Sequence, residues 1–446
     1  MKPEPDRIEA DLLRSIEHTG PGFYVVLAFL LGVIAWGFYA YWTQLVHGLG
    51  VTGMQEPVTW GMYIINFVFF IGISHAGTLI SAILRLSKAE WRRPITRMAE
   101  VITAIVLAIG GLHPIIDLGR PDRLLHLFYN GRLQSPLLWD ITSITAYFTA
   151  STIYLFVPMI PDIARLRDRG VRPRWLYEVL SWGWQGTPEQ RRVLDRAITI
   201  LMVMVIPIAV SVHTVISFIF AMTLQPGWHS TIFGPYFVVG AIYSGIATLF
   251  IVMIVLRKVH SLGGYLKEVH LRQLSRLLLV MAILWSYFTF AEYLTGYYGG
   301  EPTEMKIILY KFTGRFAWPF WLMVFLNAFL PVIVLSFRRL CTTTGILVVS
   351  IGVTIGMWLE RLNIVVPTLE NPGLSFPLHL YLPSWVEWGI FAWGVGVFCL
   401  GFLLFGKFFP LISVWETEEG LERSVSEVDE RLESYQPDVA EPSVAV

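Results

Sequence analysis

Ionisable side chains within apolar stretches are the residues of this chain most able to do chemistry. The sequence AIGGLHPIIDLGRPDR, residues 108–123, places His113 and Asp117 four positions apart, so both share one face of a helix. Pro114 has no backbone N–H, which leaves the carbonyl of Gly110 without its usual helical partner. Imidazole titrates near neutral pH, and a neighbouring carboxylate stabilises its charged form. The pattern indicates a site that exchanges protons with a bound head group.

Two further side chains are expected beside this cluster. Asp140, in SPLLWD, begins the next apolar stretch on the same side of the membrane, so it is expected to face His113. Arg120 is expected to pair with Asp117 or Asp122. In the alternative interpretation, Asp117 and Arg120 only hold a loop, and Asp140 is the N-terminal charge of a helix. We predict that His113, Asp117 and Asp140 bind and deprotonate a quinol, with Arg120 at the same site.

A second polar set follows one face of the preceding apolar stretch. Hydroxyl and amide groups on one buried face can hold a chain of water, and His75 beside them can relay protons along it. Small polar residues are also ordinary contacts between membrane helices, and this alternative remains open. The predicted proton route comprises Tyr63, Asn66, Ser74, His75, Thr78 and Arg85, with His213 and Glu292 from later stretches.

The composition places the chain among membrane proteins. It has 446 residues, of which 55% are hydrophobic and 15% charged, with a mean hydropathy of +0.59. Soluble proteins carry about 25% charged residues. Several apolar runs approach the ~20 residues that cross a bilayer as a helix. We predict an all-α membrane protein with ten spanning helices at 23–46, 58–84, 98–117, 137–160, 196–224, 235–256, 274–297, 315–337, 342–360 and 385–407.

The basic residues predict the orientation. Most of the 33 lysine and arginine residues flank the spans on the side of the N-terminus. The exceptions are Arg120, Arg123, Arg132, Lys306, Lys311, Arg315 and Arg361. By the positive-inside rule both termini are cytoplasmic, in a bacterial inner membrane. The formal net charge is zero and gives no reason to expect a nucleic-acid partner.

Three regions are predicted along the chain. Residues 1–22 form an amphipathic segment, because Ile8, Leu12 and Ile16 are spaced four apart; it lies on the membrane surface or is simply exposed. Residues 23–410 form the transmembrane domain. Residues 411–446 are an acidic tail without apolar periodicity, expected to be disordered.

A weak internal echo predicts two bundles within the transmembrane domain. The second and sixth apolar stretches both open with glycine and tyrosine, carry small residues midway and close on a basic residue. The expected bundles of four helices are 58–224 and 235–360, with the first and tenth helices peripheral. Chance similarity between apolar helices explains the echo equally well.

The sequence argues against redox metals bound by this chain. A pair of histidines that ligates haem must lie at matched depth on facing helices, but the histidines well inside spans lie at different depths. Two cysteines, Cys341 and Cys399, cannot ligate an iron–sulfur cluster by themselves. No HExxH-like motif, P-loop or dinucleotide-binding glycine motif occurs. Electrons from a quinol would therefore pass to a docked partner.

The stretch PVTWGMYIINFVFFIGISHAGTLISAILRL, followed by HPIIDLGRPDRLLHL and SPLLWD, resembles the NrfD/PsrC family, the polysulfide reductase membrane subunits. Within that family the resemblance is greatest to the ActC type of subunit of alternative complex III, whose sister subunit ActF has the same ancestry. It is strongest over about 57–160. The resemblance implies two four-helix bundles, a haem-free quinone pocket near the outer face, and docking to an extracytoplasmic iron–sulfur subunit.

The resemblance also implies the partners and the reaction. A homologous NrfD-like membrane subunit, haem c subunits, small membrane subunits and lipid are expected around the chain. The expected function is oxidation of menaquinol or ubiquinol in respiratory or photosynthetic electron transport, as a subunit inactive alone, with proton translocation as a separate hypothesis. One alternative is the quinone-reactive membrane anchor of a polysulfide or molybdopterin-type reductase. An alternative from another class is a secondary transporter.

Overall fold

The computed structural model describes residues 5–17, 19–260, 262–372 and 380–421, and within these ranges the chain forms helices and no strands. Ten helices are long and apolar enough to cross a membrane, which confirms the predicted fold class. The spanning elements are α2 (Pro21–His47), α3 (Met62–Leu86), α4 (Arg93–Asp117), α6–α7 (Pro136–Phe156 and Ile160–Asp168), α9 (Pro188–Ala221), α10 (Phe233–Val259), α11 (Glu268–Gly299), α13–α14 (Ala317–Val324 and Leu330–Ser336), α15 (Thr343–Leu369) and α16 (Trp385–Phe408). The remaining helices are α1 (Pro5–Glu17), α5 (His126–Tyr129), α8 (Arg174–Leu180) and α12 (Pro302–Phe312).

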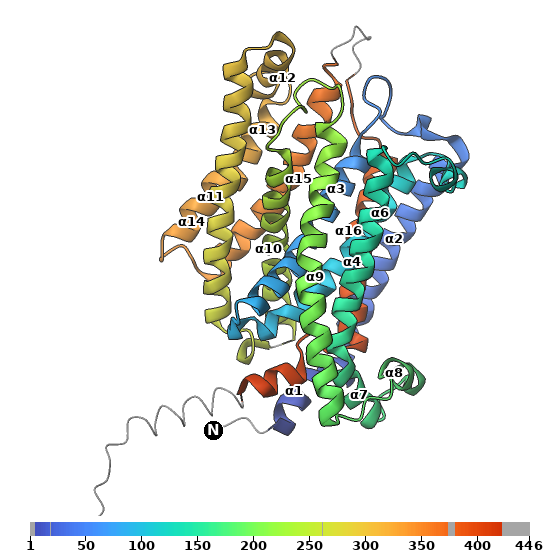
Figure 1. Ribbon diagram of the computed structural model, residues 1–446, viewed down its shortest axis with the longest axis vertical. Coiled ribbons are helices and arrows are strands. Elements are labelled where there is room, and N and C mark those ends of the chain that lie inside the picture. The colour runs from blue at the N-terminus through green and yellow to red at the C-terminus, as the bar shows by residue number, and fades with distance from the viewer. Residues whose placement is uncertain (1–4, 18, 261, 373–379, 422–446) are drawn as a thin grey trace, which may run out of the picture.

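The spanning helices pack as two groups of four (Figure 1). We call α3, α4, α6–α7 and α9 the first bundle, and α10, α11, α13–α14 and α15 the second bundle. The two bundles meet where α3 packs against α10 and α15, and α3 is accordingly buried over most of its length. The paired helices α2 and α16 lie outside both groups; α16 packs against α3 and α4, and α2 packs against α16. The arrangement matches the expected pair of bundles with two peripheral helices.

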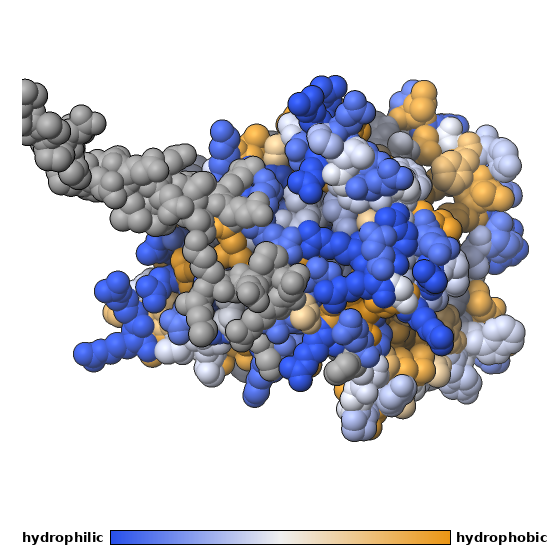
Figure 2. Space-filling view, turned by 90° about the horizontal axis from the view of Figure 1, so that it is seen from below, coloured by the Kyte–Doolittle hydropathy of each residue, from blue (hydrophilic) through white to orange (hydrophobic). Residues whose placement is uncertain are grey.

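The molecule has two polar ends. We call the end that carries α1, α7 and α8 the lower face, and the end that carries residues 118–135 and α12 the upper face (Figure 1). Figure 2 shows hydrophilic residues across much of the lower face and hydrophobic residues gathered toward its rim. Large apolar side chains such as Phe29, Trp42, Phe290 and Trp318 are exposed on the outer helices. That pattern suits a protein surrounded by lipid between two polar ends.

Both terminal segments pack against the bundle. In α1, Ile8, Leu12 and Ile16 are buried, and Lys407 of α16 donates a hydrogen bond to the carbonyl of Ile16 at 2.8 Å. The apolar face of α1 is therefore covered by protein, unlike either expectation for this segment. The predicted disorder of the tail is wrong for residues 411–421, which include a short helix beginning at Val414; residues 422–446 lie outside the described ranges.

The ninth span is longer than predicted. The sequence places its end at residue 360, where two consecutive charges begin, but α15 continues to Leu369. Glu360 and Arg361 are 1% and 2% exposed and form an ion pair with each other within the helix. Arg361 is therefore part of the protein interior and not of a loop at the upper face.

Candidate functional site

His113 lies near the upper end of α4 and is fully buried. Its Nδ1 donates to the carbonyl of Ile109 at 2.9 Å, because a carbonyl oxygen can only accept. A neutral ring with a proton on Nδ1 presents a bare lone pair on Nε2, and Nε2 has no partner. The rings of Phe70 and Trp393 flank the imidazole, with centroids 5.4 and 6.4 Å away. His113 thus has one ring nitrogen bonded to its own helix and the other unpaired, between two aromatic rings.

Two carboxylates at the same end of the first bundle also carry unpaired oxygens. Asp140, in the first turns of α6, is 5% exposed, and its Oδ1 has no hydrogen-bond partner. The Oδ1 of Asp117, at the end of α4, is likewise buried and unpaired. Among the described interactions, no hydrogen bond joins His113, Asp117 and Asp140 to one another. The three side chains lie at one end of one bundle, each with polar capacity left open.

Trp393 of α16 adds a donor that sequence reasoning missed. Its indole Nε1 is buried and has no hydrogen-bond partner, and its ring lies beside His113. Seventeen tryptophans occur in the chain, and most such residues serve as apolar contacts or interface anchors, so type alone gave no signal. Nε1 of Trp393 is therefore one more unpaired polar atom at this end of the molecule.

A hydrogen-bonded cluster next to Asp117 was also missed. Tyr63 donates to Oε1 of Gln44 at 2.5 Å, and Nε2 of Gln44 donates to the carbonyl of Ile116 at 2.8 Å. This carbonyl lies in the last turn of α4, where carbonyl groups have no backbone N–H of the same helix to accept from. A glutamine within the first apolar span was the available signal. Tyr63, predicted for the proton route, thus helps to fix the end of α4 beside Asp117.

Arg120 makes no ion pair with Asp117 or Asp140 among the described contacts. Its guanidinium pairs with Asp122 at 3.0 Å, and both side chains are mostly exposed. Of the two partners expected for it, the structure shows Asp122 and not Asp117. The charged group that interacts electrostatically with Asp117 is Glu387. The carboxylate of Glu387 accepts from the backbone N–H of Gly53 at 2.7 Å and from the hydroxyl of Tyr381.

The predicted proton route is divided among several places. His75 of α3 and His213 of α9 form a buried pair in the first bundle, with ring centroids 3.8 Å apart. The prediction that the histidines inside the spans lie at different depths is therefore wrong for this pair. Nε2 of His75 contacts the carbonyl of Ala209 at 2.6 Å, whereas neither ring nitrogen of His213 has a partner. Ser74 donates to the carbonyl of Ile71 in its own helix at 2.6 Å, a local contact.

The other members of the route lie apart from that pair. Oδ1 of Asn66 accepts from the indole of Trp358 at 3.0 Å, so Asn66 connects the first bundle to the second. Glu292 lies in the second bundle, where Ser230 donates to its carboxylate. The side chain of Thr78 lies outside the described ones. These contacts therefore do not form a continuous polar stripe along α3.

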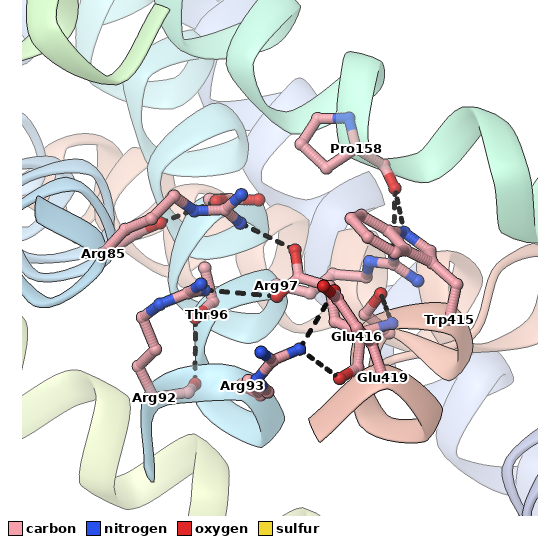
Figure 3. Close-up of polar contacts among 12 residues, drawn as sticks. Arg85, Arg92, Arg93, Thr96, Arg97, Pro158, Trp415, Glu416 and Glu419 are labelled. Carbon is pink, nitrogen blue, oxygen red and sulfur yellow. Dashed lines mark hydrogen bonds and ion pairs between the residues drawn. The ribbon is translucent and has the colours of Figure 1, made fainter. Parts of the chain in front are cut away.

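Arg85 belongs to an ionic network at the lower end of the first bundle (Figure 3). Glu416 of the C-terminal segment accepts from Arg85 at 2.7 Å and from Arg92 at 3.2 Å. Burial by itself would raise the pKa of Glu416, but the charges of the surrounding arginines outweigh it and hold the pKa below its usual value. Arg85 is thus engaged in holding the C-terminal segment.

Asp162 completes this network. It pairs with Arg97 at 2.6 Å, and both side chains are almost fully buried. The same carboxylate accepts from the backbone N–H groups of Val414 and Trp415 at 3.2 and 3.1 Å, at the start of the short helix. It acts as an N-terminal cap and an ion-pair partner at once. Within the described residues, no group of three or more His, Cys, Asp or Glu side chains is arranged to hold a metal ion.

The fold and the site together define a polytopic helical membrane protein with unpaired acid–base groups at one end of its first bundle. The chain matches the family described as polysulphide reductase, NrfD, over residues 50–371. It belongs to that family.

Three relatives are similar to the chain. A protein of Halobacterium salinarum, provisionally named as a membrane component of dimethyl sulfoxide reductase, is 33% identical over 245 residues, which cover 54% of this chain and 53% of that protein. The chain thus matches about half the length of this relative. A selenate reductase subunit of Mesobacillus selenatarsenatis is 23% identical over 89% of this chain and 95% of its own length. The Hdr-like menaquinol oxidoreductase integral membrane subunit of Archaeoglobus fulgidus is 24% identical over 92% and 98%.

Proposed function

We propose that the chain is the quinol-binding membrane subunit of a multi-subunit oxidoreductase, and that His113, Asp117 and Asp140 form its quinol site. The observation that carries the proposal is the set of unpaired buried atoms: Nε2 of His113 and one oxygen of each carboxylate. Buried polar atoms are normally paired, so a group of unpaired ones is best explained by a ligand that pairs with them. The name of the Archaeoglobus fulgidus relative refers to menaquinol, which supports this ligand class.

The chemistry of the site suits a quinol. A bound quinol supplies two electrons and two protons. Nε2 of His113 accepts a hydrogen bond from one hydroxyl and takes its proton, while Nδ1 stays bonded to Ile109 and holds the ring in place. Asp140 or Asp117 takes the second proton. The indole N–H of Trp393 positions the head group by donating to an oxygen. Menaquinol and ubiquinol both offer the two hydroxyls that this set requires.

The proposal places the upper face outside the cytoplasm. Basic residues concentrate in the segments on the lower face, which supports cytoplasmic termini in a bacterial inner membrane. Electrons then leave to an iron–sulfur subunit docked on the upper face. As in alternative complex III, we expect a homologous NrfD-like membrane subunit, haem c subunits and small membrane subunits as further partners. Proton translocation is a separate hypothesis, which concerns the paired histidines His75 and His213.

A second assignment of the partner is favoured by two relatives, whose names refer to selenate reductase and dimethyl sulfoxide reductase. In that assignment the chain is the membrane anchor of a polysulfide or molybdopterin-type reductase, and the same site exchanges electrons between the quinone pool and the reductase. The identity of the co-purifying subunits separates these two assignments. Substrate uptake by the reconstituted chain alone would instead support the transporter alternative.

The test is turnover of the intact complex. We expect His113→Gln to abolish most quinol oxidation, with a loss of about 10²–10⁴-fold, because it removes the proton acceptor. The matched control is His126→Gln, since His126 is exposed in α5 near the same face and should leave turnover unchanged. Mild-detergent purification, subunit identification by mass spectrometry and haem spectra accompany the assay. Normal turnover in an assembled His113→Gln complex would contradict the site assignment.

A further inference from the structure

The second bundle encloses a cavity near the upper face that the quinol site does not use. Its volume is about 250 Å³. A cavity of this size has room for several water molecules, since one needs about 10–15 Å³ of such space. The lining comes from α10, α11, α12, α13, α15 and the turn at residues 227–230. The polar side chains that line it include Tyr236, Glu292, Tyr293, Thr295, Glu304, Lys311, Glu360 and Asn363, with His229 and Ser230 from the turn.

An acid and a base line this cavity from neighbouring helices, Glu292 from α11 and Lys311 from α12. Lys311 is on the inner face of α12 and is 6% exposed. Its Nζ lies 5.5 Å from the centre of the Tyr293 ring. Burial lowers the pKa of Lys311 to about 8, although the charge of Glu292 opposes that shift. Ser230 donates to the carboxylate of Glu292 on the facing helix.

The helix above the cavity is fixed in place. Tyr310 of α12 donates to Glu370 at 2.6 Å, and Arg315 pairs with the same carboxylate at 2.5 Å. Glu370 follows the last turn of α15, so these contacts connect α12 to the end of the helix that forms the cavity floor. These contacts therefore hold Lys311 in its position on α12.

The inner end of the cavity holds a second acid and an unpaired amide. Glu360 accepts from the indole of Trp285 at 2.6 Å and pairs with Arg361. Asn363 is 1% exposed and lines the cavity, and its Oδ1 has no partner among the described residues. A buried carbonyl oxygen at the edge of a polar space of this size is satisfied by ordered water.

Arg361 continues the polar path toward the first bundle. A Cβ at Gly240 of α10 would lie 3.1 Å from its Nη2, so glycine leaves room there for the guanidinium. A Cβ at Gly72 of α3, in the first bundle, would lie 3.8 Å from the same atom. Arg361 also interacts electrostatically with His213 of the buried histidine pair. The ion pair thus lies between the cavity and His213.

We propose that this cavity is a water-filled proton-exchange chamber of the second bundle, in which Glu292 and Lys311 exchange protons with water at the upper face and Glu360 is the inner proton-exchanging group. A proton leaves the carboxyl group of Glu292 to a cavity water as hydronium, and the resulting carboxylate pairs with the ammonium of Lys311. The proposal does not depend on the quinol site, because it concerns water and protons alone.

Water access is tested with single cysteines in the intact complex. In a background of Cys341→Ser and Cys399→Ser, Asn363→Cys probes the depth of the cavity and Thr295→Cys its mouth. Ser350→Cys is the matched control, because Ser350 is fully buried on α15 away from the cavity lining. A membrane-impermeant methanethiosulfonate should modify Asn363→Cys about tenfold or more faster than Ser350→Cys, since a thiol reacts only where water and reagent reach it.

The outcomes are decisive because labelling of Thr295→Cys, an exposed position, shows that the reagent is active and reaches the mouth of the cavity. If Thr295→Cys is modified and the complex is intact, equal and slow labelling of Asn363→Cys and Ser350→Cys overturns the chamber. Labelling of Asn363→Cys only from the side of the lower face would overturn its proposed connection to the upper face. Mass spectrometry of the digested chain gives each rate.

Proton exchange is tested separately with a carbodiimide, which modifies protonated carboxyl groups. We expect modification at Glu292 to fall as the pH rises, and Lys311→Met to move that curve to higher pH, because a positive charge beside the carboxylate is lost. Glu292→Gln is the control for the site of modification. Labelling that is independent of pH, or a curve unmoved by Lys311→Met, would overturn the exchange role even if the chamber holds water.

Discussion

At the lower end of the first bundle, buried charges meet opposite charges: Arg97 pairs with Asp162, and Glu416 lies between Arg85 and Arg92. At the upper end, His113 and Asp140 are comparably buried, yet each has a polar atom without a partner. Breaking a paired network exposes its remaining charges to an apolar interior. Replacing an unpaired group leaves no other protein group without its partner. From this contrast we predict which side chains hold the fold and which are available to a ligand.

The largest expected effect is on the paired end. Asp162→Ala removes the partner of Arg97 and the cap of the helix at Val414, and it should lower the free energy of unfolding by about 3–5 kcal/mol. Asp122→Ala is the control, because Asp122 pairs with Arg120 in an exposed loop and should leave stability unchanged. Thermal unfolding of the purified complex measures both. Equal stability of the two variants would show that the ionic network does not stabilise the fold.

The next effect belongs to the unpaired end and concerns turnover. Asp140→Asn keeps the shape of the side chain but removes the proton acceptor, so quinol oxidation should fall about 10²-fold, which is about 2.7 kcal/mol in the activation barrier. Unfolding should be unchanged, because no protein partner of the Oδ1 is lost. Destabilisation similar to that of Asp162→Ala, with normal turnover, would show that Asp140 is a structural residue.

A smaller effect follows from pH at the paired end. The pKa of Glu416 is lowered in the folded state, so its contribution to stability is present above the unfolded value of about 4.3 and is lost as pH falls through the folded value. Glu416→Gln should cost about 1.5–3 kcal/mol near neutral pH, the range for hydrogen bonds to charged groups. It should also flatten the acid side of the stability profile. An unchanged profile in the variant would contradict the assignment of this pH dependence to Glu416.

The fold followed from the sequence more readily than the contacts at either end. Hydropathy and the positions of apolar runs predicted ten helices because each crosses the same thickness of lipid. The sequence analysis ended the ninth span at Glu360 and Arg361, because an isolated charge in hydrocarbon is costly. In the structure the two side chains form an ion pair and Trp285 donates to Glu360, which offsets that cost. The tail looked disordered for a related reason. In its described part, Glu416, Glu418 and Glu419 pair with arginines far earlier in the chain, and such pairings leave no local pattern.

The candidate residues show the same limit. His113, Asp117 and Asp140 were found from residue type and depth, which a sequence records. Trp393 and Gln44 were missed because their roles depend on α16 and α2 packing beside α4. Periodicity described the polar stripe of α3 but not its partners. In the structure Ser74 bonds to its own helix and Asn66 to Trp358 of the second bundle.

The smallest expected effect tests the boundary between the two kinds of buried group. Gln44 is paired, through Tyr63 and Ile116, but lies beside the unpaired Asp117. Gln44→Leu leaves the Tyr63 hydroxyl and the Ile116 carbonyl without their partner, which should cost about 1 kcal/mol of stability. If the cluster only closes the end of α4, turnover stays normal, as in an Asp122→Ala control. If the cluster positions Asp117 for the quinol, turnover of Gln44→Leu falls, with no loss of stability beyond that of about 1 kcal/mol. Tyr63→Phe should then show the same loss of turnover, because it removes the donor of the Tyr63–Gln44 hydrogen bond. A loss in Gln44→Leu that Tyr63→Phe does not share would show that the glutamine acts through the Ile116 carbonyl alone.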